Sequence, residues 1–450
     1  MWVWAVSRVA LLSIVAALSG CYLSHRRGAH SGTSDGSIEA AIDATSDGGV
    51  DAPDGADSSM PCPRCGPPRI VGETRFPSPG DDFPWALLGV VRVEGALGVL
   101  VAVNAFDDAA DRYVEYRLLL IGDGGATSWA EPAALLKSRE KMVAGAVDVY
   151  DGAIRAVVLG TDYSGPVEIR SATWSADGTL RLEQHLGTLP APEVSCHCTR
   201  TGGLVLLGTS SGIAAVADGD VLHVADLDLG SGMVSAVRTE PLPTTSASDA
   251  TSVSGAIVED HVLMAVGGSW PTLVPRPAAV ATGPTPGPWL ARLLPGSDTD
   301  PAPIVASDRA GFRVARFIHD IDDSSRSTIH LWQLDAAGIS IAEVTFATGG
   351  FQPLALTMTA ETPSSALLWV DHDPADLGAG NLRLARFDAS ISGGDCSSTA
   401  TLAHLPNGVL GLDPRSLVAL RHEDAVVAVF IERDRASSRI TALELPDCLR

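Results

Sequence analysis

The sequence predicts an all-β fold built from repeated four-stranded units, on the evidence of its composition, a weak internal repeat and the pattern of its apolar runs. Of the 450 residues, 45 are Gly and 29 are Pro, and only 19% are charged. This composition favours turns and short strands over long helices, while the 46% hydrophobic content is sufficient for a large core. The repeat and the apolar runs then place the individual strands.

The repeat is clearest in tight turns that separate one strand-like run from the next. From Gly95 to Asp424 there are six steps over 329 residues, or about 55 residues per step. That step is close to the length of four strands with their loops. The turns are Glu94-Gly95, Asp151-Gly152, Ser211-Gly212, Glu259-Asp260, Arg309-Ala310-Gly311, Pro363-Ser364 and Glu423-Asp424.

Each turn is followed by a short apolar run, nearly unbroken and partly β-branched, which is typical of a strand with both faces buried. These predicted central strands are 98–103, 154–159, 213–217, 262–266, 312–318, 366–370 and 425–431. Runs with period-two alternation, which indicates one solvent-facing side, follow at 167–174, 221–227, 329–334, 382–387 and 440–445. Turns such as Asp177-Gly178 then lead into a further strand, which makes four strands per unit.

This arrangement resembles a β-propeller with about seven four-stranded blades over residues 70–450, without the signature residues of WD40 or kelch repeats. Six blades, eight blades and tandem β-sandwiches are the alternatives. The last unit ends after its third strand at Leu445, whereas residues 69–76 precede the first unit without a partner. We therefore expect residues 69–76 to supply the fourth strand of the last blade and so remove the open edges of the ring.

The N-terminus carries a targeting signal. An apolar run from Val9 to Leu18 follows Arg8, is too short to span a membrane and ends in Leu18-Ser19-Gly20-Cys21. These four residues resemble the lipobox of bacterial lipoproteins. The resemblance implies removal of residues 1–20 as a signal peptide, acylation of Cys21 (palmitate included) and, because Tyr22 follows instead of Asp, export to the outer membrane of a Gram-negative bacterium. The alternative is a signal peptide cut elsewhere, with Cys21 an ordinary cysteine.

Residues 21–69 are predicted to form a flexible acidic tether between the lipidated cysteine and the folded domain. Gly, Ser, Asp, Ala and Pro dominate this segment, which leaves few large apolar groups to offset the entropy of ordering it. A flexible chain of this length has an end-to-end distance of roughly 40 Å. The formal net charge of -23, which becomes -24 when Arg8 leaves with the signal peptide, opposes nucleic acid as a partner.

Six cysteines besides Cys21 form an even set for an oxidising compartment, and they allow 15 full pairings. A disulfide between Cys65 and Cys448 would join the ends of the ring, and one between Cys62 and Cys65 is the rival. Zinc held by four thiolates, or by three together with His197, and a redox site at Cys62-Pro-Arg-Cys65 are the alternatives to a disulfide framework. The disulfide candidates are Cys62, Cys65, Cys196, Cys198, Cys396 and Cys448.

Three motifs suggest chemistry and have structural explanations. Gly208-Thr-Ser210-Ser-Gly212 matches the G-x-S-x-G nucleophile elbow, but only five apolar residues separate it from the next turn, so we expect a hairpin. Ser175-Ala-Asp177-Gly178-Thr179 partly resembles the Asp box of sialidase propellers, which is itself structural. Acidic side chains in the loops after the central strands are expected to lie on one face. The calcium candidates among them are Asp371, Asp373 and Asp376.

No catalytic constellation is visible in the sequence, and no cofactor other than calcium is indicated. The functional hypothesis is therefore a lipid-anchored envelope protein with a non-catalytic, propeller-like domain that binds a protein or a glycan. The competing hypothesis is an extracytoplasmic hydrolase or lyase whose site lies at the central mouth of the ring and draws residues from several units. A purely structural spacer is a third hypothesis. Titratable side chains converging on the mouth would favour the enzyme, and an apolar or merely acidic mouth would oppose it.

Overall fold

The computed structural model describes residues 66–446, all within the compact unit Ala56–Arg450, with gaps in many connections. The gaps are 78–82, 107–111, 132–143, 162–164, 191–201, 209, 244–251, 268–278, 286, 295–302, 309–310, 320–326, 348–352, 362–363, 373–378, 389–399, 406–415, 424 and 434–436. The predicted signal peptide, Cys21, the tether up to residue 65 and all six disulfide candidates lie outside the described residues. The described part of the chain contains no helix long and apolar enough to cross a membrane.

The described residues form 28 β-strands and no α-helix. Blade 1 contains β2 (Phe83–Val93), β3 (Ala96–Phe106), β4 (Arg112–Gly122) and β5 (Thr127–Trp129), and blade 2 contains β6 (Ala144–Tyr150), β7 (Ala153–Gly160), β8 (Val167–Trp174) and β9 (Leu180–Leu189). Blade 3 contains β10 (Gly203–Leu207), β11 (Ser211–Asp218), β12 (Val221–Asp228) and β13 (Met233–Pro241), and blade 4 contains β14 (Ser252–Val258), β15 (His261–Gly267), β16 (Ala279–Pro284) and β17 (Leu290–Leu293). Blade 5 contains β18 (Ile304–Asp308), β19 (Gly311–His319), β20 (Ser327–Leu334) and β21 (Ser340–Ala347), and blade 6 contains β22 (Pro353–Glu361), β23 (Ser364–His372), β24 (Gly380–Asp388) and β25 (Ala400–Leu405). Blade 7 contains β26 (Leu417–His422), β27 (Ala425–Arg433), β28 (Ser437–Leu445) and β1 (Arg69–Pro77).

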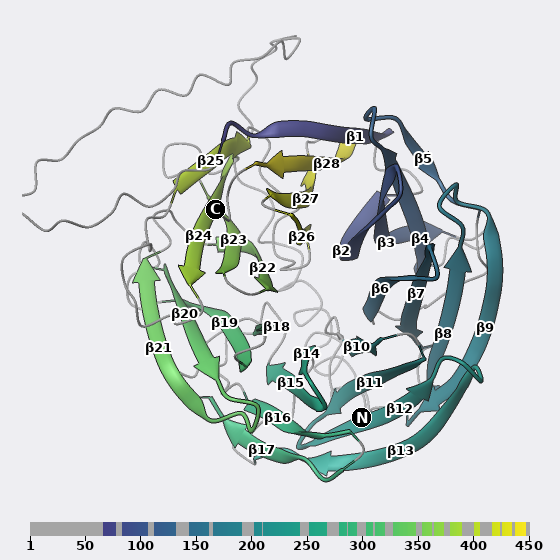
Figure 1. The fold of residues 1–450 in the computed structure, drawn as a ribbon, viewed down its shortest axis with the longest axis vertical. Coiled ribbons are helices and arrows are strands. Elements are labelled where there is room, and N and C mark those ends of the chain that lie inside the picture. Colours follow the sequence, from purple (N-terminus) through teal and green to yellow (C-terminus); the bar gives the residue numbers. More distant parts are fainter. Residues whose placement is uncertain are drawn as a thin grey trace, which may run out of the picture. The chain divides into compact units, whose positions relative to one another are not determined.

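Each blade is an antiparallel four-stranded sheet, and the seven blades form a ring (Figure 1). The first strand of each blade lies at the axis and the fourth lies at the rim, as β2 and β5 show for blade 1. The predicted all-β fold with seven four-stranded blades is confirmed. This count excludes the alternatives of six blades, eight blades and tandem sandwiches.

The second strand of each blade is the most deeply buried, as its apolar run predicts. All eight residues of β7 are buried, and so are the six inner residues of β11. Burial alternates along much of the third strands β8 and β12, which confirms the period-two interpretation. The two faces of a central strand belong to different interfaces, since Ile154 and Val158 pack toward blade 1 while Val157 and Leu159 pack toward blade 3.

Seven apolar clusters make up the core of the described domain, and each draws its residues from two neighbouring blades. The cluster between blades 1 and 2, for example, combines Leu100 and Tyr116 with Ile154 and Trp174. Each sheet carries apolar side chains on both of its faces, and each face is covered by one of the two neighbouring blades. Within the described residues, therefore, every blade shares its core with both neighbours.

The ring closes as the sequence predicts. β1, at the N-terminal end of the domain, pairs antiparallel with β28, from Arg69 opposite Glu444 to Pro77 opposite Ser437. Blade 7 thus combines three C-terminal strands with one N-terminal strand. A bulge between Ile70 and Gly72 shifts the register by one residue within this seam.

Three residues predicted to lie in turns are the first residues of strands in the structure. Ser211, predicted to lie in a turn, is the first residue of β11, and Gly208 and Ser210 lie in the turn before it. Gly311 and Ser364 likewise open β19 and β23. Cross-strand packing accounts for the difference in blade 3, because pairing Val205 with Ile213 places both apolar side chains in the same cluster between blades 3 and 4.

Candidate functional site

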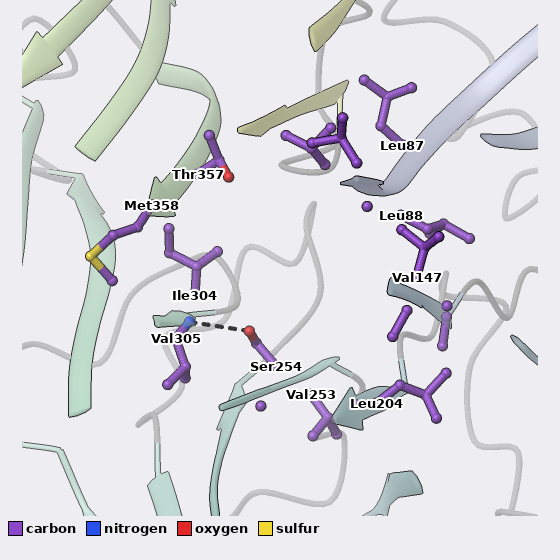
Figure 2. Close-up of a pocket in the computed structure, with 18 of the residues that line it drawn as sticks. Leu87, Leu88, Val147, Leu204, Val253, Ser254, Ile304, Val305, Thr357 and Met358 are labelled. Carbon is purple, nitrogen blue, oxygen red and sulfur yellow. Dashed lines mark hydrogen bonds between the residues drawn. The ribbon is translucent and has the colours of Figure 1, made fainter. Parts of the chain in front are cut away.

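A cavity of about 370 Å³ follows the axis of the ring, and the first strand of every blade contributes to its lining (Figure 2). This volume lies within the range of small-molecule sites. The lining side chains are mostly aliphatic. They include Leu87, Leu88, Val90, Val147, Leu204, Val253, Ile304, Val305, Leu356, Met358, Leu417 and Val418.

Among the described lining residues only Ser254 and Thr357 carry a polar side chain, and neither ionises. The Ser254 hydroxyl accepts a hydrogen bond of 3.1 Å from the backbone N–H of Val305, which ties β14 to β18 across neighbouring blades. General acid and base catalysis requires titratable groups within hydrogen-bonding distance of the substrate. The described walls of this cavity supply apolar contacts, backbone groups and two hydroxyls, a set suited to holding a group and unsuited to proton transfer.

Glycines set the spacing of the inner strands. A Cβ at Gly89 would lie 2.8 Å from Val147 Cγ1, and a Cβ at Gly145 would lie 2.8 Å from Leu88 Cδ1. Each of β2 and β6 therefore inserts a side chain over a glycine of the other. The sequence analysis missed this feature, although a glycine four to six residues before the turn recurs in blades 1 to 4 and is a usable signal.

Asp371, one of the three calcium candidates, lies on β23 inside blade 6 and is fully buried. The Nε of Arg383 donates a hydrogen bond of 2.6 Å to its Oδ2. Burial raises the pKa of Asp371 from 3.8 to about 6, against the opposing effect of Arg383. Its place in a strand, paired with arginine, differs from the exposed loop in which the sequence placed it.

Asp373 and Asp376 lie outside the described residues. No group of three or more His, Cys, Asp or Glu side chains suited to a metal ion occurs among the described residues. Calcium binding by these residues stays a prediction.

Glu432 repeats the pattern of Asp371 in blade 7. Its buried carboxylate accepts hydrogen bonds from Arg439, at 2.5 Å, and from Thr441, at 3.2 Å. Burial raises the pKa of Glu432 above its usual range, while Arg439 acts in the opposite direction. Arg439 also reaches Glu73 of β1 at 3.3 Å, so the ion pairs extend across three strands of the closing blade. These groups stabilise the ring and do not face the axial cavity.

The two motifs with a resemblance to catalytic or sialidase sequences occupy turns. Residues 208–210 connect β10 to β11 with Gly208 at φ 61°, and a strand follows Ser210 instead of a helix. Asp177 accepts hydrogen bonds from the Ser175 hydroxyl at 2.6 Å and the Thr179 N–H at 3.0 Å, and these bonds lower its pKa. Ser210 thus lies in the hairpin that the spacing predicts, and Asp177 stabilises its own turn.

The two faces of the ring differ in the length of their connections. Since the strands of a blade are antiparallel, connections from the second to the third strand and from one blade to the next share one face. All connections on this face together carry more than twice as many acidic as basic residues. We call it the long-loop face; its longest connections are 130–143, 190–202, 242–251, 268–278, 294–303 and 406–416.

On the opposite face, most connections have five residues or fewer, and the one between β24 and β25, residues 389–399, is the longest. Binding residues concentrate in long loops held by a rigid scaffold. The long-loop face and the axial cavity are therefore the candidate functional site.

No protein-family model matches the chain, and no curated protein resembles it in sequence. Solved structures share its fold. A polysaccharide lyase of family PL25, an ulvan lyase bound to -[GlcA(1-4)Rha3S]-, is 8% identical, with a TM-score of 0.50 over 83% of this chain and 96% of that chain.

Two further solved structures are similar at lower TM-scores. The endosialidase of phage phi92 is 10% identical, with a TM-score of 0.44 over 84% of this chain and 69% of that chain. The Dos1 propeller is 8% identical, with a TM-score of 0.43 over 82% and 95%. Identities this low show the fold alone.

Proposed function

We propose that the chain is a lipid-anchored protein of the bacterial cell envelope whose propeller binds a protein or glycan ligand at its long-loop face, without catalysis. The anchor is Cys21, and the segment from residue 22 to residue 65 links it to the ring. Tyr22 after the lipidated cysteine favours the outer membrane. The acidic connections of the face favour a ligand that carries basic groups.

One observation carries the non-catalytic part of this proposal. The axial cavity of a propeller is where residues from all blades converge, and its described lining holds aliphatic side chains, backbone and two hydroxyls. The buried acids Asp371 and Glu432 are paired with arginines inside their blades. An enzyme that cleaves glycosidic bonds by hydrolysis typically needs two carboxyl groups on either side of the scissile bond.

The test is chemical cross-linking of the tagged full-length protein in intact cells, followed by purification and identification of the captured molecules. The Cys21→Ala variant is the informative comparison, and Ser24→Ala, outside the lipidation motif, is the matched control. We expect fatty-acid labelling and recovery with membranes for the wild type and Ser24→Ala, and loss of both for Cys21→Ala. We also expect one reproducible partner that depends on the anchor.

Two outcomes would overturn the proposal. Membrane recovery of Cys21→Ala equal to that of the wild type would refute the anchor. Turnover of any member of a panel of anionic and neutral polysaccharides by the purified protein would refute the absence of catalysis and establish the hydrolase or lyase alternative.

A further inference from the structure

The axial cavity lies toward the long-loop face of the ring. Its lining includes residues 144–147 at the start of β6, 203–204 at the start of β10 and 417–419 at the start of β26. In β2 and β22 the lining residues lie nearer the middle of the strand. The first strand of a blade receives the connection from the preceding blade, and those connections belong to the long-loop face. Most of the described lining therefore comes from the ends of the inner strands nearest that face.

The wall of this cavity has two chemically different sides (Figure 2). Leu88 and Val147, from blades 1 and 2, belong to a side that is aliphatic. Across the cavity lie Ser254 and Thr357, from blades 4 and 6, on either side of Ile304 from blade 5. Both hydroxyl groups thus share one side, and the rest of the described lining has no polar side chain.

The two hydroxyls match a single uncharged polar group. Ser254 Oγ already accepts a hydrogen bond of 3.1 Å from the N–H of Val305, so its own proton is the part that a ligand can accept. The Thr357 hydroxyl can donate or accept. A carboxylate or an ammonium group would lose its hydration here without meeting an opposite charge in the described lining.

The volume of the cavity sets the length of the apolar part of a ligand. At about 30 Å³ for each group the size of a water molecule, 370 Å³ accommodates roughly twelve such groups. Water against aliphatic walls finds few hydrogen-bond partners, so its replacement by an apolar group is favourable. We propose that the axial cavity binds one uncharged aliphatic molecule of about ten carbons that carries a single polar group such as a hydroxyl.

This site goes beyond the binding of a protein or glycan proposed for the loops. A sugar residue carries several hydroxyl groups, and most of them would lie against side chains such as Leu88, Val147 and Met358 without a hydrogen-bond partner. The described cavity therefore disfavours a glycan that the loops accept. The two binding events hold or fail separately.

Calorimetric titration of the full chain with 1-hexanol, 1-octanol and 1-decanol tests the proposal. The chain carries Cys21→Ala, which removes the lipidation site and the need for detergent. We expect one molecule bound per chain and an affinity that rises about tenfold for each two added carbons, because every buried methylene adds a similar increment. Decanoate, which differs from 1-decanol in its charge, should bind at least roughly tenfold more weakly.

Filling the cavity gives the decisive comparison. Ile304→Trp puts a larger side chain into the cavity and should weaken 1-decanol binding at least roughly 100-fold. Ile341→Trp is the matched control, because Ile341 is 59% exposed on β21, the outermost strand of the same blade, and it should bind 1-decanol as the parent chain does. Circular dichroism and the melting temperature report whether each variant is folded.

Thr357→Val keeps the test decisive if Ile304→Trp does not fold. Valine has nearly the shape of threonine and lacks its hydroxyl, so 1-decanol should bind about fivefold more weakly. Unchanged binding in this variant would contradict the assignment of the polar group to this side of the cavity.

Three results would overturn the proposal as a whole. They are no binding of any of the three alcohols, equal affinities for 1-hexanol and 1-decanol, and unchanged 1-decanol binding in folded Ile304→Trp. Equal binding of decanoate and 1-decanol would refute the uncharged end group. The titration involves neither the anchor nor a captured partner, so its failure and the failure of the cross-linking experiment are told apart.

Discussion

At the scale of single residues, an arginine–carboxylate pair adds polar contacts to a junction between blades that an apolar cluster also joins. Arg155 on β7 donates to both carboxylate oxygens of Asp148 on β6, at 3.0 and 2.5 Å, and to the carbonyl of Gly208 in the next blade at 3.0 Å. Its guanidinium also lies 4.8 Å from the ring centre of Tyr150. One side chain thus joins blades 2 and 3.

Replacing Arg155 tests this junction. Arg155→Leu should lower the free energy of unfolding by about 3 kcal/mol, because it leaves Asp148 without its partner. Arg155→Lys should recover part of that loss, since lysine keeps the charge and loses the two-pronged geometry. Arg75→Lys changes a pair whose arginine is 69% exposed and should cost less than about 0.5 kcal/mol. Urea unfolding measures all three, and equal costs for Arg155→Leu and Arg75→Lys would refute the junction.

Asp371 predicts a specific pH dependence. Its folded pKa of about 6 exceeds the ordinary 3.8, so the folded state binds the proton more tightly. This contribution to stability is present below pH 4 and is lost as the pH rises to 6, on the order of 2–3 kcal/mol. Asp371→Asn should remove that slope in urea unfolding between pH 4 and 7, whereas Asp123→Asn, at an exposed turn, should keep it. An unchanged slope in Asp371→Asn would show that Asp371 titrates normally.

At the scale of elements, β1 decides whether the ring is closed. It pairs with β28 and also packs against blade 1, where Phe76 joins the cluster that contains Leu97 and Ile121. Without β1, blade 7 would expose the edge of β28, and unpaired edges promote aggregation. Gly72 lies in β1 where a side chain would overlap Ile121.

Gly72→Ala should therefore weaken the closure. We expect a loss of about 1–3 kcal/mol in urea unfolding, because the added methyl forces β1 away from blade 1. Gly124→Ala is the matched control, since nothing lies within 4 Å of a Cβ there, and it should change stability by less than about 0.5 kcal/mol. Equal effects of the two substitutions would show that β1 does not pack tightly against blade 1.

At the scale of the whole molecule, the seven shared clusters couple every blade to both neighbours. Buried tryptophans report on different interfaces, with Trp174 between blades 1 and 2, Trp332 between blades 4 and 5, and Trp369 between blades 5 and 6. No one of these interfaces survives the loss of a neighbouring blade, so the ring is expected to unfold as a unit.

Cooperative unfolding predicts that tryptophan fluorescence and far-ultraviolet circular dichroism change together. Both signals should give one transition with the same urea midpoint, in the wild type and in Arg155→Lys. Midpoints that differ between the two signals, or a plateau between two transitions, would show that groups of blades unfold independently.

The sequence by itself predicted the central strands, the grouping of strands in fours, a count of about seven blades and the origin of the closing strand, and the structure settled the count at seven. These follow from local periodicity, from turns that recur about every 55 residues and from an unpaired run at 69–76 opposite an incomplete last unit. The sequence also predicts lipidation at Cys21, from a motif of four neighbouring residues, and this stays a prediction.

Only the tertiary structure decided which side chains meet. Asp371 reads as a loop acid, yet Arg383 and the neighbouring strands bury it. The aliphatic axial cavity combines residues from seven strands spread over more than 300 positions, and the contact of Gly66 with Pro446 joins the two ends of the domain. Contacts of this kind depend on how the ring closes and on which strands come close to each other. Local periodicity carries no information about contacts between residues so far apart in the chain.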